Sequence, residues 1–165
     1  SIIVSSMEGS RPLLVEVQAL VTSSSSIGMP RRMSAGFDHN RTSLLVAIME
    51  KRLGLNLQGE DIFINIAGGL KISEPAVDMG VAAAIAGSFR NRSVDPHTVM
   101  IGEVGLTGEV RSVMQLEARL AEAERLGFKK CVVPHSVKED RLINKSGSLI
   151  LVPVKTLSDA FDTVF

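Results

Sequence analysis

Residues 61–92 contain the feature that most restricts how this chain can fold. A short, nearly continuous apolar segment, DIFINIAGG (61–69), precedes a proline and the small-residue segment PAVDMGVAAAIAGSFRNR (75–92). An apolar run of this length is typical of a central strand, and a proline is well suited to the first turn of a helix. Because alanine and glycine let a neighbouring element approach closely, the sequence predicts a mostly buried helix packed against a sheet.

The remaining segments alternate between strand-like and helix-like patterns. We expect residues 13–21 and 30–37 to form two strands paired as a long hairpin at a sheet edge. The segment 38–54 predicts a helix, with Asp38 or Asn40 as its N-cap and Gly54 as its stop. The second half of the chain predicts, in order, two short strands within 98–113, a helix at 115–128, a strand at 129–134, a polar connection at 138–148, a strand at 149–155 and a helix at 157–165. This alternation indicates an α/β architecture, a mixed sheet packed by helices in two layers.

The length and composition favour an ordinary globular chain. At 165 residues and 45% hydrophobic, it can bury a substantial core, and we expect one domain over residues 10–165 preceded by a tail or linker over 1–9. Its 18 basic and 18 acidic residues cancel, so any surface that binds nucleic acid must be a local basic patch. The single cysteine, Cys131, lies in an apolar run and is expected in the core.

Several chemistries and locations are disfavoured by what the sequence lacks. There is no GxxxxGK[ST] phosphate loop, which argues against an ATPase site. The three histidines, His39, His97 and His135, are scattered and lack metal-ligand spacing with the cysteine, so no metal site is expected. No apolar run approaches the roughly 20 residues that span a bilayer, and the start lacks the order of a signal peptide, so no membrane partner is expected. Because the chain begins with Ser, we interpret it as a fragment of a longer protein.

Two strings resemble the proteolytic domain of Lon peptidases. They are GGLKISEPAVDMGVAAAIAGS (68–88) and GEVGLTGEVRSVMQLEARLAEAERLGFKKCVVP (102–134). The resemblance implies the Lon proteolytic-domain fold of the ribosomal-protein-like superfamily. In that family the first string carries a nucleophilic serine at the head of a helix, and the second carries the lysine that activates it by taking its proton. Aligned on the glycines, Asp78 occupies the serine position and Glu117 the lysine position.

Neither acid suits the role of the residue it replaces. An ionised carboxylate is a poor base for activating a hydroxyl, and the nucleophile itself is missing, so the resemblance implies a pseudo-peptidase without catalytic residues. We expect Asp78 at an exposed position, where the first turn of a helix stabilises a carboxylate. The alternative is an acidic pair of Asp78 and Glu117, which would need a cation such as Lys71 or Arg111, or a shared proton.

A peptidase with a relocated dyad remains a second reading. Ser73 and Lys71 lie two residues apart and would face the same side of a strand. A third reading is a regulatory Lon-like domain attached to a chelatase-type ATPase, which would bind partners but not DNA.

Longer strings resemble the carboxy-terminal Lon-like domain of the RadA (Sms) family of DNA repair and recombination proteins. They are SRPLLVEVQALV (10–21), PRRMSAGFDHNRTSLLVAIMEKRLGL (30–55), DIFINIAGGLKISEPAVDMGVAAAIAGSFRNRSV (61–94) and IGEVGLTGEVRSV (101–113). The family implies a hexameric branch-migration motor in which this domain is an oligomerisation scaffold and a DNA-binding surface. It also implies ATP, Mg and Zn for domains that this fragment lacks, and no cofactor in the fragment itself.

Binding to DNA requires cations that neutralise phosphates. The candidates lie in loops and at element ends: Arg31, Arg32, Arg41, Lys71, Arg90, Arg92 and Arg111. With no Trp or Tyr in the chain, backbone contacts with single-stranded or branched duplex DNA are favoured over base stacking. A recombinase is a further partner that the family implies. The expected location is cytoplasmic in a bacterium, and a chloroplast or mitochondrion in a eukaryote.

Overall fold

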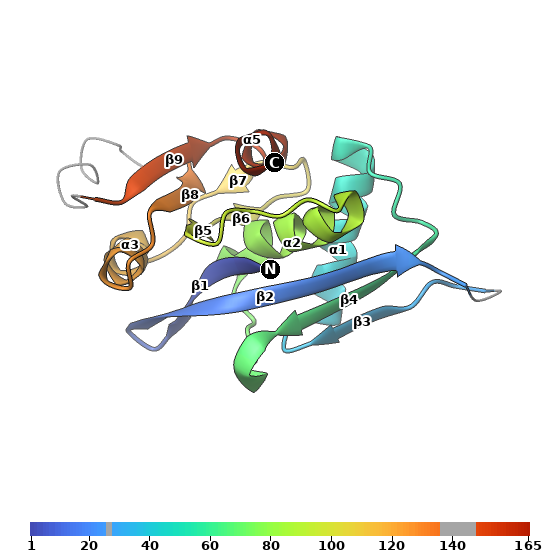
Figure 1. Ribbon diagram of the computed structural model, residues 1–165, viewed down its shortest axis with the longest axis horizontal. Helices are drawn as coiled ribbons and strands as arrows, with labels where there is room; N and C mark the ends of the chain where they lie inside the picture. The colour runs from blue at the N-terminus through green and yellow to red at the C-terminus, as the bar shows by residue number, and fades with distance from the viewer. Residues whose placement is uncertain (26–27, 136–147) are drawn as a thin grey trace.

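A seven-stranded mixed sheet with helices on both faces forms the framework of the molecule in a computed structural model (Figure 1). The structure describes residues 1–25, 28–135 and 148–165. The strand order is β3-β4-β2-β1-β5-β8-β9, and a separate two-stranded ribbon consists of β6 and β7. The predicted class, an α/β protein with a mixed sheet, is therefore confirmed, but helices cover both faces of the sheet, so there are three layers and not the two expected. Most of the polar connection expected at 138–148 lies outside the described residues.

The strands follow the apolar runs of the sequence closely. Their bounds are β1 Ile2–Glu8, β2 Arg11–Ser23, β3 Arg32–Ala35, β4 Glu60–Ile66, β5 Thr98–Met100, β6 Glu103–Val104, β7 Val110–Arg111, β8 Lys130–Pro134 and β9 Ile150–Val154. Strands β5 and β8 are short and almost fully buried, as continuous apolar runs require, whereas Asn65 of β4 is exposed and Phe63 is half-buried.

The helices also begin and end close to the predicted residues. Their bounds are α1 His39–Leu53, α2 Asp78–Arg90, α3 Leu116–Arg125 and α5 Leu157–Val164, with short 3₁₀ turns η1 Ala67–Gly69 and η2 Pro75–Val77. Asp38 caps α1, because its side chain accepts a hydrogen bond from Asn40 N, and Gly54 ends α1 with a φ of 68°. None of the described helices is both long enough and apolar enough to cross a membrane.

Two sequence expectations about the first strands are wrong. Residues 2–8, expected within a tail, form β1, which pairs with β2 on one side and with β5 on the other. The expected hairpin between 13–21 and 30–37 does not form, because β2 pairs with β1 and β4 while β3 runs parallel to β4 at the sheet edge. Local alternation of residue types identified the strands, but it carries no information about which strand each one pairs with.

Helices pack on the two faces of the sheet unequally. Buried residues of α1, α2 and α5 share one core cluster with the inward side chains of β1, β2 and β4. A second cluster lies on the other face, where Leu120 and Ala123 of α3 pack against Val99, Cys131 and Val133. Burial raises the pKa of the Cys131 thiol, as expected for a core cysteine.

The small residues of α2 let the helix pack closely against β1. Asp78 to Gly87 are all buried, and a Cβ added at Gly80 would lie 2.1 Å from Val4 Cγ1 on β1. The predicted buried helix is thus confirmed, with the sheet as the element that approaches it. The beginning of α2 is consequently fixed against the centre of the sheet, at the position where the aligned family carries its nucleophile.

Candidate pseudo-active site

Asp78 is the first residue of α2, and its side chain is completely buried, with 0% exposure. The expected exposed position is therefore wrong. Val77 and Met79, its neighbours in the chain, are equally buried, and Met79 N donates to Gly102 O at 3.1 Å. These contacts press the first turn of α2 against the segment that leads to β6, so the carboxylate faces the protein interior.

Arg41 of α1 is the ion-pair partner of Asp78. Its Nε lies 2.8 Å from Oδ1, and its Nη2 donates to Oδ2, giving a two-pronged contact. The backbone NH of Val104 donates to Oδ2 at 3.1 Å. The sequence named Lys71 or Arg111 as examples of the cation that an acidic pair of Asp78 and Glu117 would need. The cation that binds Asp78 is Arg41, which the sequence analysis placed among the DNA-binding candidates.

The electrostatics of this pair reflect its burial. Removal from water raises the pKa of Asp78, while the hydrogen bonds from Arg41 and Val104 act in the opposite direction. The hydrogen bond to Asp78 raises the pKa of Arg41. Arg41 Nη2 also lies 4.0 Å from Glu103 Oε1. The arrangement is an ion pair in which both oxygens of the Asp78 carboxylate already accept hydrogen bonds.

Glu117, at the other dyad position, is exposed in the first turn of α3, as expected from its place in the sequence. The alternative acidic pair with Asp78 does not form, since the Asp78 carboxylate binds Arg41 and Val104. The acid nearest to that ion pair is Glu103 on β6.

A second buried ion pair, which the sequence analysis did not predict, joins Arg119 to Glu74. Arg119 lies two residues C-terminal to Glu117. Arg119 is only 2% exposed, and its guanidinium binds Glu74 through Nη1 at 2.6 Å and Nη2 at 3.1 Å. Its remaining donors bind Met114 O at 3.0 Å and Ser5 O at 2.7 Å. The pair thereby connects α3 to β1 and to the turn before α2. Position 119 falls on the same helical stripe as Leu116 and Ala123, and this signal could have identified it.

The residues of the alternative dyad, Ser73 and Lys71, are both exposed. Between them, Ile72 forms a bridge to Phe37, which supports their expected placement on one side of an extended segment. Within the described part of the chain, no hydrogen bond joins the Ser73 hydroxyl to the Lys71 amine.

The basic candidates fall into two groups. Three have carboxylate partners: Arg31 binds Asp61 at 3.2 Å, Arg41 binds Asp78, and Arg111 binds Glu109 at 3.4 Å. Arg31 and Arg32 do not form one patch, because Arg31 lies over the Phe63 ring while Arg32 donates to Leu57 O.

The other four cations, Arg32, Lys71, Arg90 and Arg92, make no ion pair with a carboxylate in the described segments. Arg90 and Arg92 lie together at the C-terminal end of α2. There the Arg90 guanidinium lies over the Phe161 ring, 5.9 Å from its centroid, and Arg92 donates to Phe165 O at 3.4 Å.

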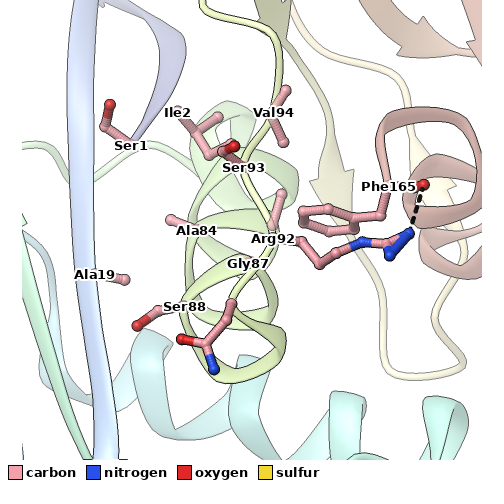
Figure 2. A pocket seen from close by; sticks show the side chains of 12 residues that line it. Ser1, Ile2, Ala19, Ala84, Gly87, Ser88, Arg92, Ser93, Val94 and Phe165 are labelled. Atoms are coloured by element: carbon pink, nitrogen blue, oxygen red, sulfur yellow. Dashed lines mark hydrogen bonds between the residues drawn. The ribbon is translucent and has the colours of Figure 1, made fainter.

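A pocket of about 330 Å³ lies beside the same end of α2. Figure 2 shows Ile2 and Ala19 on one side of the helix, and Arg92 extending to Phe165 on the other. Among the residues that the structure describes, no group of three or more His, Cys, Asp or Glu side chains could hold a metal ion. Arg92 is the charged side chain among the described residues that line this pocket, and Arg90 lies two positions before it in the chain.

Known proteins resemble this chain in sequence over most of its length. Residues 16–137 match the family model described as subunit ChlI of Mg-chelatase. DNA repair protein RadA of Halalkalibacterium halodurans is 49% identical over 162 residues, 98% of this chain and 35% of the relative. The Bacillus subtilis RadA is 54% identical over 134 residues (81% and 29%), and the Synechocystis RadA 53% over 127 residues (77% and 25%).

The chain spans about a third of the length of the relatives it matches, all of them bacterial proteins. The resemblance noted in the sequence thus covers nearly all of this chain, at 49% to 54% identity. The chain belongs to the family described by the ChlI model and, within it, to the RadA DNA repair proteins, as their Lon-like domain.

Proposed function

We propose that this chain is a non-proteolytic Lon-like domain of a RadA-type DNA repair and recombination protein. In this proposal it serves as an oligomerisation scaffold and a sequence-independent DNA-binding surface for a hexameric branch-migration motor. ATP, Mg and Zn would belong to other domains of that protein, and a recombinase is a further partner. The names of the relatives support the repair role, and a bacterial host would place the protein in the cytoplasm.

The observation that carries the non-proteolytic part is the buried ion pair at the nucleophile position. Acyl transfer needs a nucleophile that is exposed to the scissile carbonyl and a base within hydrogen-bond reach. Asp78 is fully buried and bound to Arg41, whereas Glu117 is exposed on another helix. Replacement of both dyad residues by acids, one of them committed to an ion pair, leaves no proton relay at this place.

Incubation of the purified domain with an unfolded protein substrate tests this part. We expect no cleavage above that of a buffer control. Sustained cleavage that disappears in Ser73→Ala, but persists in a matched Ser43→Ala control on α1, would instead establish the relocated dyad of Ser73 and Lys71.

Four cations without carboxylate partners support the DNA-binding part. A cation already bound to an acid has less free energy to gain from a phosphate, because it must give up its partner. Arg90 and Arg92 are exposed, lie two positions apart and make no ion pair with an acid in the described segments, so they are the leading pair among these candidates. Arg32 and Lys71 add charge elsewhere on the surface.

A gel-shift titration with single-stranded and branched DNA of several sequences tests that assignment. We expect Arg90→Ala with Arg92→Ala to weaken binding for every sequence alike, since backbone contacts carry no sequence information. Arg31→Ala with Arg32→Ala should have a smaller effect, because Arg31 is bound to Asp61. Equal affinity of wild type and the Arg90/Arg92 double variant would remove these residues from the DNA surface.

One observation favours the third reading, a regulatory domain of a chelatase-type ATPase. The family model that matches residues 16–137 takes its description from a Mg-chelatase subunit. That reading predicts binding to an ATPase partner without DNA affinity, so absence of a DNA shift at low salt would favour it over the repair scaffold.

A further inference from the structure

Strand β2 is longer than the strand that pairs with it on one side. It runs from Arg11 to Ser23, and β4 pairs with it from Val17 to Ser23. On the other side, β1 covers β2 only as far as Val17, which lies opposite Ile2. Beyond Val17, no strand within the described residues pairs with β2 on the side of β1. We call this side of residues 18–20 the open edge of β2.

The backbone of Ala19 faces the open edge. In a strand, successive residues direct their N–H and C=O groups to opposite sides. Val21 N donates to Ser88 Oγ of α2 at 2.9 Å, so the odd-numbered residues of β2 point away from β4 at this place. Ala19 belongs to the same set and is half-buried. Backbone groups that are shielded from water are normally paired, which favours a strand partner for Ala19.

The pocket of about 330 Å³ lies along this open edge. Its lining includes Ser1, Ile2, Ala19 and the small residues Ala84 and Gly87 of α2. Figure 2 shows Ser1 and Ala19 on the two adjacent strands, beside the helix. Ile2 belongs to the core cluster that β1 shares with α2. Because side chains alternate along a strand, a residue two positions before Ile2 would face α2 as well, at the pocket.

We propose that the residues that precede Ser1 in the longer protein extend β1 along the open edge. If the register of β1 and β2 continues, Ser1 lies opposite Gln18, and the residue immediately before Ser1 lies opposite Ala19. We call that residue the preceding residue. It exchanges two backbone hydrogen bonds with Ala19 and places its side chain in the pocket. Apolar walls at Ala84, Val94 and Phe165 favour an apolar side chain there.

The length of the relatives and the position of the chain ends argue for this occupant. The chain covers 35% of the Halalkalibacterium halodurans relative, so most of such a protein lies outside the matched region. Both Ser1 and Phe165 line the pocket. Ser1 leads directly into a strand that is already paired with β2, whereas Phe165 follows helix α5. A segment continuous with β1 reaches the open edge at a high effective concentration, which a separate molecule lacks.

Ser88 limits the length of the extension. Its hydroxyl already accepts the hydrogen bond from Val21 N, so a longer added strand would lose a ladder bond at Val21. The extension is therefore short, about two residues, with one hydrogen-bonded pair at Ala19. It connects the domain to the part of the protein before it through a paired strand instead of a free linker. This extension depends on the family membership of the chain, and not on the DNA-binding or scaffold roles proposed above.

Hydrogen exchange of the Ala19 amide in the longer protein tests the proposal. Proline in place of the preceding residue should speed this exchange at least about tenfold, because it removes the donor to Ala19 O. Ser1→Pro is the matched control, since the Ser1 N–H points away from β2 and its loss should leave the Ala19 rate unchanged. The Val21 amide, bonded to Ser88, is the internal reference. Rapid exchange of Ala19 in the wild type, or equal rates in the two proline variants, would overturn the extension.

A disulfide between the preceding residue and position 19 gives a second measurement. Residues directly opposite each other have Cα atoms about 5.5 Å apart, within the range of a disulfide. With cysteine at the preceding residue, Ala19→Cys should close this disulfide within one chain on mild oxidation, at every protein concentration. Leu20→Cys is the control and should not, because Leu20 is 57% exposed on the opposite face from Ala19. The native Cys131 is buried, and peptide mass spectrometry identifies the linked positions.

Two results of the oxidation experiment would contradict the proposal. Absence of the disulfide with Ala19→Cys would overturn the extension of β1. A disulfide that forms only between chains, and increases with protein concentration, would assign the open edge to a strand of another molecule and overturn it as well. DNA affinity and self-association of the same samples measure the proposed function separately, so a failure of one is distinguished from a failure of the other.

Discussion

At the scale of single residues, two buried arginine–carboxylate pairs connect elements that are distant in the chain, and one of them contains Asp78, the residue that aligns with the serine of the Lon dyad. Arg41 with Asp78 fixes the start of α2, and Arg119 with Glu74 fixes α3 to β1 and the preceding turn. Burying an ion pair is costly unless the remaining donors and acceptors are satisfied. Arg119 satisfies this condition through Met114 O and Ser5 O, and Asp78 through Val104 N.

Arg41→Ala should destabilise the domain by about 3 kcal/mol, because it leaves the Asp78 carboxylate buried without a cation. This value is the lower end of the usual range for breaking a buried ion pair, because 25% of the Arg41 side chain is exposed to solvent. Urea unfolding measures the change. Arg111→Ala, which breaks an exposed pair with Glu109, is the control and should cost less than about 1 kcal/mol. A cost for Arg41→Ala no greater than for the control would contradict the role of the pair.

Asp61 should make stability dependent on pH. Hydrogen bonds from Arg31, foremost that of its backbone NH, hold the pKa of Asp61 below its ordinary value of 3.8. A lowered folded-state pKa contributes stability that is fully present above pH 3.8 and is lost as the pH falls through the folded-state value. Thermal unfolding of wild type and Asp61→Asn between pH 6 and 2.5 checks this. The difference between them should shrink below pH 3.8, and a constant difference would argue against it.

At the scale of elements, the contact of α2 with the sheet depends on residues without side-chain bulk. Gly80 faces Val4 so closely that β1 and α2 could not hold this separation with a larger residue. The same contact fixes the first turn of α2 and, with it, Asp78. Position 80 therefore links the packing of the core to the geometry of the Asp78–Arg41 ion pair.

Gly80→Ala should destabilise the domain by about 1–3 kcal/mol through overpacking, despite the better helix propensity of alanine. Gly59→Ala is a suitable control, because an added Cβ there meets no atom within 4 Å. Chemical denaturation of both variants compares them. Stabilisation by Gly80→Ala would mean that α2 and β1 can separate freely.

At the scale of the whole molecule, the distribution of charge decides how the domain meets DNA. The formal net charge is zero, so attraction to phosphates has to come from a local group. If Arg32, Lys71, Arg90 and Arg92 all contact phosphates, the logarithm of the duplex-binding constant should fall with the logarithm of salt at a slope of about −3.6. Removing Arg90 and Arg92 should reduce the slope by about half. Fluorescence anisotropy at several salt concentrations measures it, and a slope near zero would exclude phosphate contacts.

The sequence determined the local structure of this protein. Capping by Asp38, the stop at Gly54 and the small residues of α2 all depend on neighbours a few positions away, so their patterns predicted the elements correctly. The family alignment likewise placed Asp78 and Glu117 at their helix starts.

The tertiary structure alone decided which elements meet. It moved β3 from a hairpin with β2 to the far side of β4, brought residues 2–8 into the centre of the sheet, and placed Arg41 against Asp78 across 37 positions of chain. Pairing over such separations depends on the packing of the complete sheet, and no local pattern encodes it. For that reason the start of the helix that carries Asp78 could be located from the sequence, while the ion-pair partner of Asp78 could not.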